Sequence, residues 1–182
     1  MPRSYAHALL TGFLAMACSS PPPPPPAAPP PAEPCQRTGV VVTVSASQQV
    51  NASAGGPGMP VQVRIYQLKS DASLRNAAFD DVWQNDKAVL HDDLLKRDEQ
   101  TAYPGKSVQL KLDLLPATTS IAAVALFRDS KGKDWFSTFE LEPLKAKPPC
   151  PPAESQISLW LDRMKIQDGR GREAQGTGAP NL

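Results

Sequence analysis

Strict alternation of apolar and polar residues is the feature that most limits what this chain can fold into. From residue 108 to 114, one valine and three leucines alternate with Gln, Lys and Asp. A period of two places every second side chain on one face, as in a half-buried β-strand. Six more segments have strand patterns: 39–46, 61–66, 97–103, 121–127, 135–141 and 157–162. We predict that 97–103 is an edge strand. We predict that 121–127 is a central strand, because it is apolar on both faces. Seven short strands separated by turn signals predict a mainly β protein, a β-sandwich.

One segment, residues 72–89, breaks the alternation. Phe79, Val82 and Trp83 are spaced by three and four, which is the spacing of one helical face. Asn76 is a candidate break or cap between two short helices. We therefore predict a small helical insertion after the second strand, with Phe79, Val82 and Trp83 as packing residues.

The first 17 residues have the layout of a bacterial signal peptide. Arg3 precedes an apolar run from residue 8 to 17, which ends on small residues beside Cys18. The run is shorter than the roughly 20 apolar residues of a membrane-spanning helix. The segment 15–18, Ala-Met-Ala-Cys, resembles the lipobox of bacterial lipoproteins, although Met16 stands where a smaller residue is usual. We expect a lipid on Cys18; the alternative is simple secretion, with Cys18 removed or left as a free thiol.

Residues 18–36 are expected to form a lipidated, proline-rich linker. Ten of the fourteen residues in Pro21–Pro34 are proline, a composition that favours an extended polyproline II rod. At about 3.1 Å per residue the rod would hold a domain roughly 45–50 Å from its lipid. In the bacterial sorting pattern, a residue other than Asp after the lipidated cysteine directs the protein to the outer membrane. Ser19 fits that pattern, so we expect an outer-membrane anchor with the domain facing the periplasm.

The chain has three cysteines, Cys18, Cys35 and Cys150. If Cys18 carries lipid, the other two can pair in an oxidising compartment, and the bridge would join both ends of one domain. The alternative is two unpaired thiols. A metal site is not expected, because no CxxC pair occurs.

Charge and composition describe one ordinary domain. Removal of residues 1–17 takes away Arg3 and no acidic residue, so 19 basic residues become 18 against 18 acidic ones. A neutral chain without a basic stripe gives no reason to expect nucleic-acid binding. We expect the sandwich domain to span residues 37–163 and the Gly-rich segment 164–182 to be a flexible tail.

The sequence gives little support for an enzyme. His7 lies in the predicted signal peptide, which leaves His91 as the single histidine for acid–base or nucleophilic chemistry. The adjacent Asp92 and Asp93 are read as part of a solvated turn, because neighbouring residues rarely converge on one ion. No phosphate- or dinucleotide-binding motif is present. We expect no catalytic activity, no cofactor and no metal.

The segment between the first two predicted strands is unusually long. It has thirteen residues, whereas hairpin loops usually have two to five. Loops of this length are either binding loops or disordered, and composition does not separate the two readings. Its residues are Gln48, Gln49, Val50, Asn51, Ala52, Ser53, Ala54, Gly55, Gly56, Pro57, Gly58, Met59 and Pro60.

A family resemblance emerges from motifs in a fixed order across residues 39–163. Arg64-Ile-Tyr-Gln-Leu68 follows a valine-rich strand, and four further motifs come after it: Phe79-x-x-Val82-Trp83, Leu90-x-Asp92-Asp93-Leu94-Leu95, Pro104-Gly105, and Val124-Ala-Leu-Phe-Arg128 before a Trp135 strand. Together they resemble the TssJ family, the outer-membrane lipoproteins of type VI secretion systems. The weak lipobox, the long proline spacer and the Gly-rich tail depart from the family's usual pattern.

The resemblance implies a transthyretin-like β-sandwich with a structural role. Such a protein binds the periplasmic C-terminal domain of TssM, an inner-membrane protein, and builds the envelope-spanning complex together with TssL. The loop between the first two strands contributes to TssM binding in that family, and here this loop is Gln48–Pro60. The alternative is a periplasmic lipoprotein that binds a small ligand or carbohydrate, which would need a concave site with clustered aromatic and polar groups.

Overall fold

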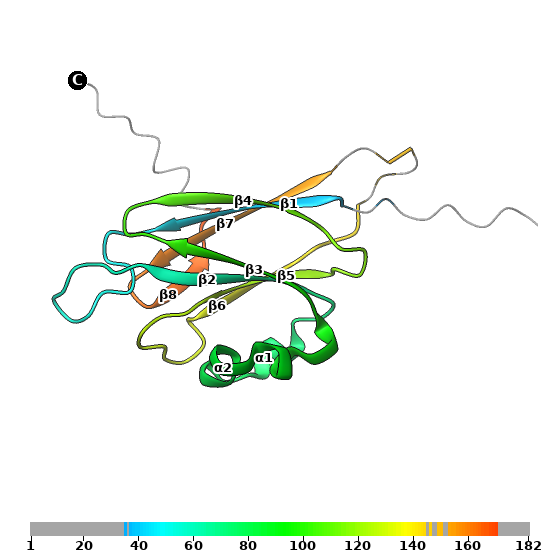
Figure 1. Ribbon diagram of the computed structural model, residues 1–182. Coiled ribbons are helices and arrows are strands. Elements are labelled where there is room, and N and C mark those ends of the chain that lie inside the picture. Colours follow the sequence, from blue (N-terminus) through cyan, green and yellow to red (C-terminus); the bar gives the residue numbers. More distant parts are fainter. Residues whose placement is uncertain (1–34, 36, 145, 147–148, 151–152, 171–182) are drawn as a thin grey trace, which may run out of the picture. The chain divides into compact units, whose positions relative to one another are not determined.

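The computed structural model describes residues 35, 37–144, 146, 149–150 and 153–170, which form a two-layer β-sandwich with helices on one side (Figure 1). Eight strands make two four-stranded sheets, in the orders β4-β1-β7-β8 and β3-β2-β5-β6. The strands are β1 (Gly39–Ala46), β2 (Val61–Leu68), β3 (Leu94–Ala102), β4 (Ser107–Asp113), β5 (Ser120–Ala125), β6 (Phe136–Glu140), β7 (Glu154–Asp162) and β8 (Lys165–Asp168).

The alternating residues of the two sheets meet in one core. In β1, Val40, Val42 and Val44 are fully buried, and β4 and β7 flank β1 on its two sides. β1 and β7 run parallel, whereas every other neighbouring pair is antiparallel. From β2 of the second sheet, Val63 and Ile65 are also fully buried. A sandwich of this kind is held mainly by the apolar area that the two inner faces remove from water.

The seven predicted strands are confirmed, with shifts of a few residues at their ends. β5 lies inside its sheet and is buried along its whole length, as its two-sided apolar pattern predicts. β3 is an edge strand, as predicted, but it begins at Leu94 instead of Arg97.

The predicted helical insertion is α1 (Ala72–Asn76) and α2 (Phe79–Leu90), followed by the 3₁₀ turn η1 (His91–Asp93). These helices lie outside the β3-β2-β5-β6 sheet (Figure 1). Asn76 ends α1, and Val82 is buried as expected. The prediction that Trp83 packs inside is wrong, because 46% of its surface is exposed. The helix turns Val82, Asp86 and Leu90 toward the sheet, and Trp83 lies one position off that stripe.

The expected start of the flexible tail at residue 164 is also wrong. Residues 165–168 form β8, which pairs with the second half of β7, and Ile166 is buried. The chain reverses at Arg163, whose φ of 49° allows a tight turn between the two strands. The sandwich therefore extends through Asp168, while the expected tail residues 171–182 lie outside the described residues.

Cys35 and Cys150 form a disulfide in the structure, with their Cα atoms 5.3 Å apart. Cys35 comes four residues before β1, and Cys150 comes four residues before β7. Because β1 and β7 are parallel neighbours, the bridge joins the chain at the same end of both strands. Cys18 and Pro21–Pro34 lie outside the described residues.

Candidate functional site

The loop that joins β1 to β2 is anchored at both of its ends. Val50 is fully buried in the core, and its carbonyl accepts a hydrogen bond from the Met59 amide at 2.8 Å. We call Val50, Asn51, Met59 and Pro60 the stem of the loop, and residues 52–58 its tip. The tip contains neither helix nor strand, and its position is fixed by the stem on which it stands.

Asn51 joins the stem to two other loops at the same end of the sandwich. Its Nδ2 donates to the Pro60 carbonyl at 3.0 Å, and its Oδ1 accepts from the Arg128 amide at 3.0 Å. Its backbone amide donates to the Arg163 carbonyl at 2.7 Å. The residue is buried and has a φ of 53°, a conformation that Asn tolerates better than most residues. Through its side chain and its backbone amide, one residue therefore links the β1–β2, β5–β6 and β7–β8 loops.

The turn between β3 and β4 packs against the same loop. A Cβ at Gly58 would overlap the carbonyl of Gln48 and lie 3.2 Å from the Cβ of Pro104, and a Cβ at Gly105 would overlap the Gln48 side chain. Gly58 needs glycine because a Cβ would meet backbone that cannot move aside, whereas Gly105 needs it because its φ of 67° disfavours other residues. Because the β1–β2 loop and the β3–β4 turn are in close contact, they form one continuous surface at this end of the molecule.

Two large apolar side chains are exposed on that surface. Met59 is 47% exposed and Tyr103 is 55% exposed. The register pairs Val61 with Ala102, so Met59, two residues before β2, and Tyr103, directly after β3, lie at the same end of the sheet. Exposed aromatic and methionine side chains on a fixed scaffold are typical of protein-binding surfaces.

The structure thus refines the predicted loop. Most of its thirteen residues are at least partly exposed, but Val50 and Asn51 are buried and support the rest. The sequence did not identify Tyr103 or the linking role of Asn51. A polar residue next to a buried valine in a Gly-rich loop is the only local signal for Asn51, and nothing local marks Tyr103.

Beneath α2, a charged cluster centres on the buried carboxylate of Asp86. Tyr66 donates its hydroxyl proton to this carboxylate at 2.8 Å, and Arg97 and Arg64 approach it at 2.9 and 3.4 Å. Burial alone raises the pKa of Asp86, but the hydrogen bonds from Arg97 and Tyr66 and the two positive charges outweigh it and hold this pKa below its usual value. Burial, and after it the bond to Asp86, raises the pKa of Tyr66. The cluster holds α2 on the sheet.

The motif at residues 64–68 now has a physical explanation. Arg64 also donates to the carbonyls of Val82 and Trp83 at 3.2 and 3.4 Å. Gln67 is fully buried; it donates to the Asp113 carbonyl and accepts from the Leu115 amide, both at 2.9 Å. These polar residues of β2 attach the helical insertion and the β4–β5 connection to the sheet.

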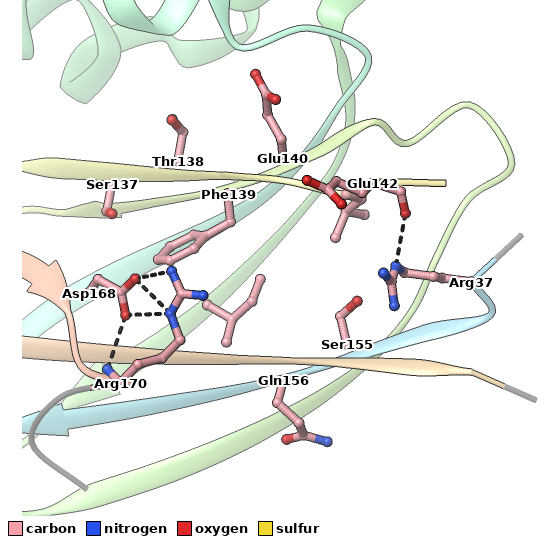
Figure 2. A pocket seen from close by; sticks show the side chains of 12 residues that line it. Arg37, Ser137, Thr138, Phe139, Glu140, Glu142, Ser155, Gln156, Asp168 and Arg170 are labelled. Carbon is pink, nitrogen blue, oxygen red and sulfur yellow. Dashed lines mark hydrogen bonds and ion pairs between the residues drawn. The ribbon is translucent and has the colours of Figure 1, made fainter. Parts of the chain in front are cut away.

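A groove of about 460 Å³ opens along the side of the sandwich between β6 and β7 (Figure 2). Arg37 lies at one end and the Asp168–Arg170 pair at the other, and Phe139 is the one aromatic residue in its lining. A carbohydrate site would need clustered aromatic rings. Trp83, Trp135 and Trp160 do not line this groove, which therefore does not match the small-ligand alternative.

Within the part of the chain that the structure describes, no group of three His, Cys, Asp or Glu side chains could hold a metal ion. The described helices include none with the length and apolar character to cross a membrane. His91 follows α2 directly and is exposed, with a φ of 45°. It lines a shallow depression with Lys87 and Arg97, and no described carboxylate or nucleophile shares that depression.

The class that these observations define is a β-sandwich domain that carries a hydrogen-bonded loop platform at one end. Comparison with known protein families identifies the family of this chain. The family model described as type VI secretion lipoprotein (VasD, EvfM, TssJ) matches residues 38–164, and the chain belongs to this family. It is therefore a type VI secretion lipoprotein, and the role of this family is structural, not enzymatic. No curated protein sequence matches the chain significantly.

Solved structures share the fold. The chain is similar to the T6SS lipoprotein TssJ1 from Pseudomonas aeruginosa, with 24% identity, a TM-score of 0.60, and coverage of 73% of this chain and 97% of that one. Serratia marcescens Lip, described as a membrane-bound component of the type VI secretion system, gives 24% identity and a TM-score of 0.62 over 72% and 96% of the two chains. A chain in the structure described as the TssM C-terminal domain from EAEC gives 22% identity and a TM-score of 0.57 over 72% and 97%.

Proposed function

We propose that this protein anchors the type VI secretion membrane complex to the outer membrane and binds the periplasmic C-terminal domain of TssM. The lipid on Cys18 holds one end in the outer membrane, and the proline-rich linker carries the domain into the periplasm. The β1–β2 loop then meets TssM, which joins TssL in the wider complex. The fixed loop platform is the observation that carries this proposal.

Three features of that platform support binding of a folded protein. Its stem is hydrogen-bonded and is buried at Val50 and Asn51, so little conformational entropy is lost when a partner binds. Met59 and Tyr103 offer exposed apolar contact area at the same end of the sheet. A chain with this fold also occurs in the structure described as the TssM C-terminal domain. We propose Met59, Tyr103 and the exposed loop tip as the contact surface.

The test is calorimetric titration of the mature chain, carrying Cys18→Ser, with the periplasmic domain of TssM from the same genome. We expect binding in the micromolar range or tighter. Met59→Ala and Tyr103→Ala together should weaken it roughly tenfold or more, as truncation of central apolar contacts does. Leu115→Ala is the matched control, because Leu115 is also 40% exposed but lies beside Cys35, at the other end of the sandwich.

Each outcome has a distinct meaning. Equal weakening by Leu115→Ala and by the double variant would move the interface away from the β1–β2 loop while keeping the partner. Two folded proteins that do not bind would overturn the TssM assignment. Fractionation tests the anchor separately: Cys18→Ser should release the protein from membranes, and a variant that stays in the outer-membrane fraction would refute lipidation at this cysteine.

A further inference from the structure

Trp83 is a large exposed apolar side chain that the proposed function leaves unused. Nearly half of its surface is exposed on α2, whereas tryptophan is highly buried on average. Among the described residues, the other large apolar side chains with such exposure are Met59, Tyr103 and Leu115. Tryptophan is one of the residue types most enriched among the few side chains that carry the binding energy of protein interfaces. Trp83 is therefore a candidate contact residue.

The Trp83 ring is held in one orientation by its neighbours. It stacks on Phe79, with the ring centroids 6.2 Å apart and the ring planes at 27°. The guanidinium carbon of Arg64 lies 6.0 Å from the centre of the Trp83 ring, near enough for a cation–π contact. Arg64 is itself fixed, because it donates to the Val82 carbonyl at 3.2 Å and pairs with Glu99 at 3.2 Å. A side chain held in this way loses little entropy when a partner binds.

A row of polar side chains on the outer face of β2 and β3 joins Trp83 to the loop platform. The register pairs Arg64 with Glu99 and Gln62 with Thr101, and Gln62 donates to the Glu99 carboxylate at 2.6 Å. These side chains face away from the core, because the β2 residues that alternate with Gln62 and Arg64 are buried. We call Gln62, Arg64, Glu99 and Thr101 the outer strip. It lies on the face of the sheet that carries the helices (Figure 1).

The outer strip leads from Trp83 to Tyr103. Side chains of β3 alternate between the two faces of the sheet, so Tyr103, the residue after the strand, continues the row of Glu99 and Thr101. From Glu99 to Tyr103 this row spans about 13 Å, at roughly 3.3 Å per residue. Arg64, the partner of Glu99, lies against the Trp83 ring. An exposed aromatic side chain therefore stands at each end of the strip.

We propose that the surface that binds the periplasmic domain of TssM extends from the β1–β2 loop along the outer strip to Trp83. This inference rests on the proposed function and adds a second aromatic anchor to it. A stable interface uses about 20–30 residues on each side, whereas the seven residues of the loop tip with Met59 and Tyr103 make nine. The surface must therefore continue onto neighbouring residues. Aromatic anchors with polar residues between them match the usual composition of a protein interface.

The outer face of the other sheet offers no comparable extension. Beside the loop, its outward side chains are small or polar, with Thr43 on β1 and Ser107 and Gln109 on β4. Among the described residues, no large exposed apolar side chain belongs to β1, β4, β7 or β8. A partner that binds the loop would therefore gain a second aromatic contact by extending over β2 and β3 to α2.

The first experiment compares two exposed glutamines, one on each outer face. Gln62 lies in the outer strip and Gln109 lies on β4, and each donates its side-chain amide to a neighbouring side chain. The mature chain with Cys18→Ser is titrated with the TssM periplasmic domain. Gln62→Arg should weaken binding by about tenfold or more, because the larger charged side chain would hold the partner away from the strip. Gln109→Arg is the matched control and should leave the affinity unchanged.

The second experiment changes Trp83 itself. Trp83→Ala should weaken binding by about tenfold or more, whereas Trp83→Phe, which keeps an aromatic ring against Phe79, should weaken it less. Circular dichroism checks that the variants are folded. Photo-cross-linking gives a readout that a small loss of stability would not move: p-benzoylphenylalanine at position 83 should form an adduct with the TssM domain, and the same residue at position 109 should not.

The outcomes separate this inference from the proposed function. Failure of the wild type to bind would overturn both. Binding that Gln62→Arg and Trp83→Ala leave unchanged, or that Gln109→Arg weakens equally, would overturn this inference alone and leave the loop platform as the site. Dimerisation in sedimentation that Trp83→Ala abolishes, without any effect on TssM binding, would assign this face to a second copy of the chain instead.

Discussion

Replacement of Asn51 by alanine tests whether one side chain holds the candidate binding surface together. The change removes two hydrogen bonds, to the Pro60 carbonyl and from the Arg128 amide, each 3.0 Å long. Each is worth about 1 kcal/mol net, and more if the partner is left buried and unpaired. Alanine at a φ of 53° adds a further cost of about 1 kcal/mol. We expect a loss of about 3 kcal/mol, a large part of the 5–15 kcal/mol typical of a domain.

Glycine at the same position separates the two causes. Asn51→Gly loses the same hydrogen bonds, but glycine adopts the positive φ without steric cost. Glycine also gives the unfolded chain more conformational entropy, which partly cancels that advantage in the free energy of unfolding. We expect it to be less destabilising than Asn51→Ala by about 0.5–1 kcal/mol. Urea unfolding followed by circular dichroism measures both, and Asn51→Ala should lower the midpoint by roughly 1–2 M.

The same variants should weaken TssM binding through loss of order, since Asn51 itself is buried. A change in unfolding free energy below about 0.5 kcal/mol for Asn51→Ala would refute the reasoning, because it would place this residue among ordinary surface positions. Binding that stays unchanged while stability falls by the expected amount would show that the partner does not need the fixed stem.

Two further predictions concern the disulfide and the charged cluster. Replacing Cys35 and Cys150 by alanine opens a loop closed across 115 residues, and the chain-entropy relation gives a loss of up to about 5 kcal/mol; a loss under about 1 kcal/mol in urea unfolding would contradict it. Asp86 has a lowered pKa when folded, so its stabilising effect is present above its unfolded value of 3.8 and fades as the pH falls below that. The stability gap between the wild type and Asp86→Asn should therefore be widest near neutral pH and close under acid, and a gap that is constant with pH would assign the effect to packing.

The strands could be predicted because burial and sequence period agree in them. In β1 the period of two and the buried valines coincide, and β4 repeats the same agreement across from it. β8 was missed because four residues with one buried side chain, Ile166, carry too little periodicity to be recognised. Its pairing depends on the turn at Arg163, a conformation that the sequence around it does not require.

In the helical insertion, the local sequence pattern predicts the helix, but tertiary contacts decide which of its side chains are buried. The spacing predicted a helix correctly but assigned Trp83 to its buried face. α2 is interrupted at Asn85, where φ is −152° and ψ is 68°. The next residue, the charged Asp86, faces the sheet together with Val82 and Leu90. A buried carboxylate held by Arg64 and Arg97 is invisible to hydrophobic periodicity, because its partners come from β2 and β3.

Loop length alone was enough to locate the candidate site, but not to order its residues. The excess of residues between β1 and β2 draws attention to one end of the sandwich, since such a length has to be either structured by contacts or disordered. Which residues are support and which are surface depends on long-range bonds, such as the one from the Arg128 amide to Asn51. Tyr103 joins the surface only through the β2–β3 register.

The strand β1 gives the proposed function a mechanical basis. It begins four residues after Cys35, at the end of the domain where the linker enters, and its last residue lies one position before Ser47 and the loop. Within the domain, the eight residues of β1 would join the side of the proposed anchor to the proposed partner surface. β1 is hydrogen-bonded to β4 on one side and to β7 on the other, so tension between the two membranes would run along a strand supported on both edges. Because β1 is already extended, it could transmit that tension without the separation of either sheet from its neighbour.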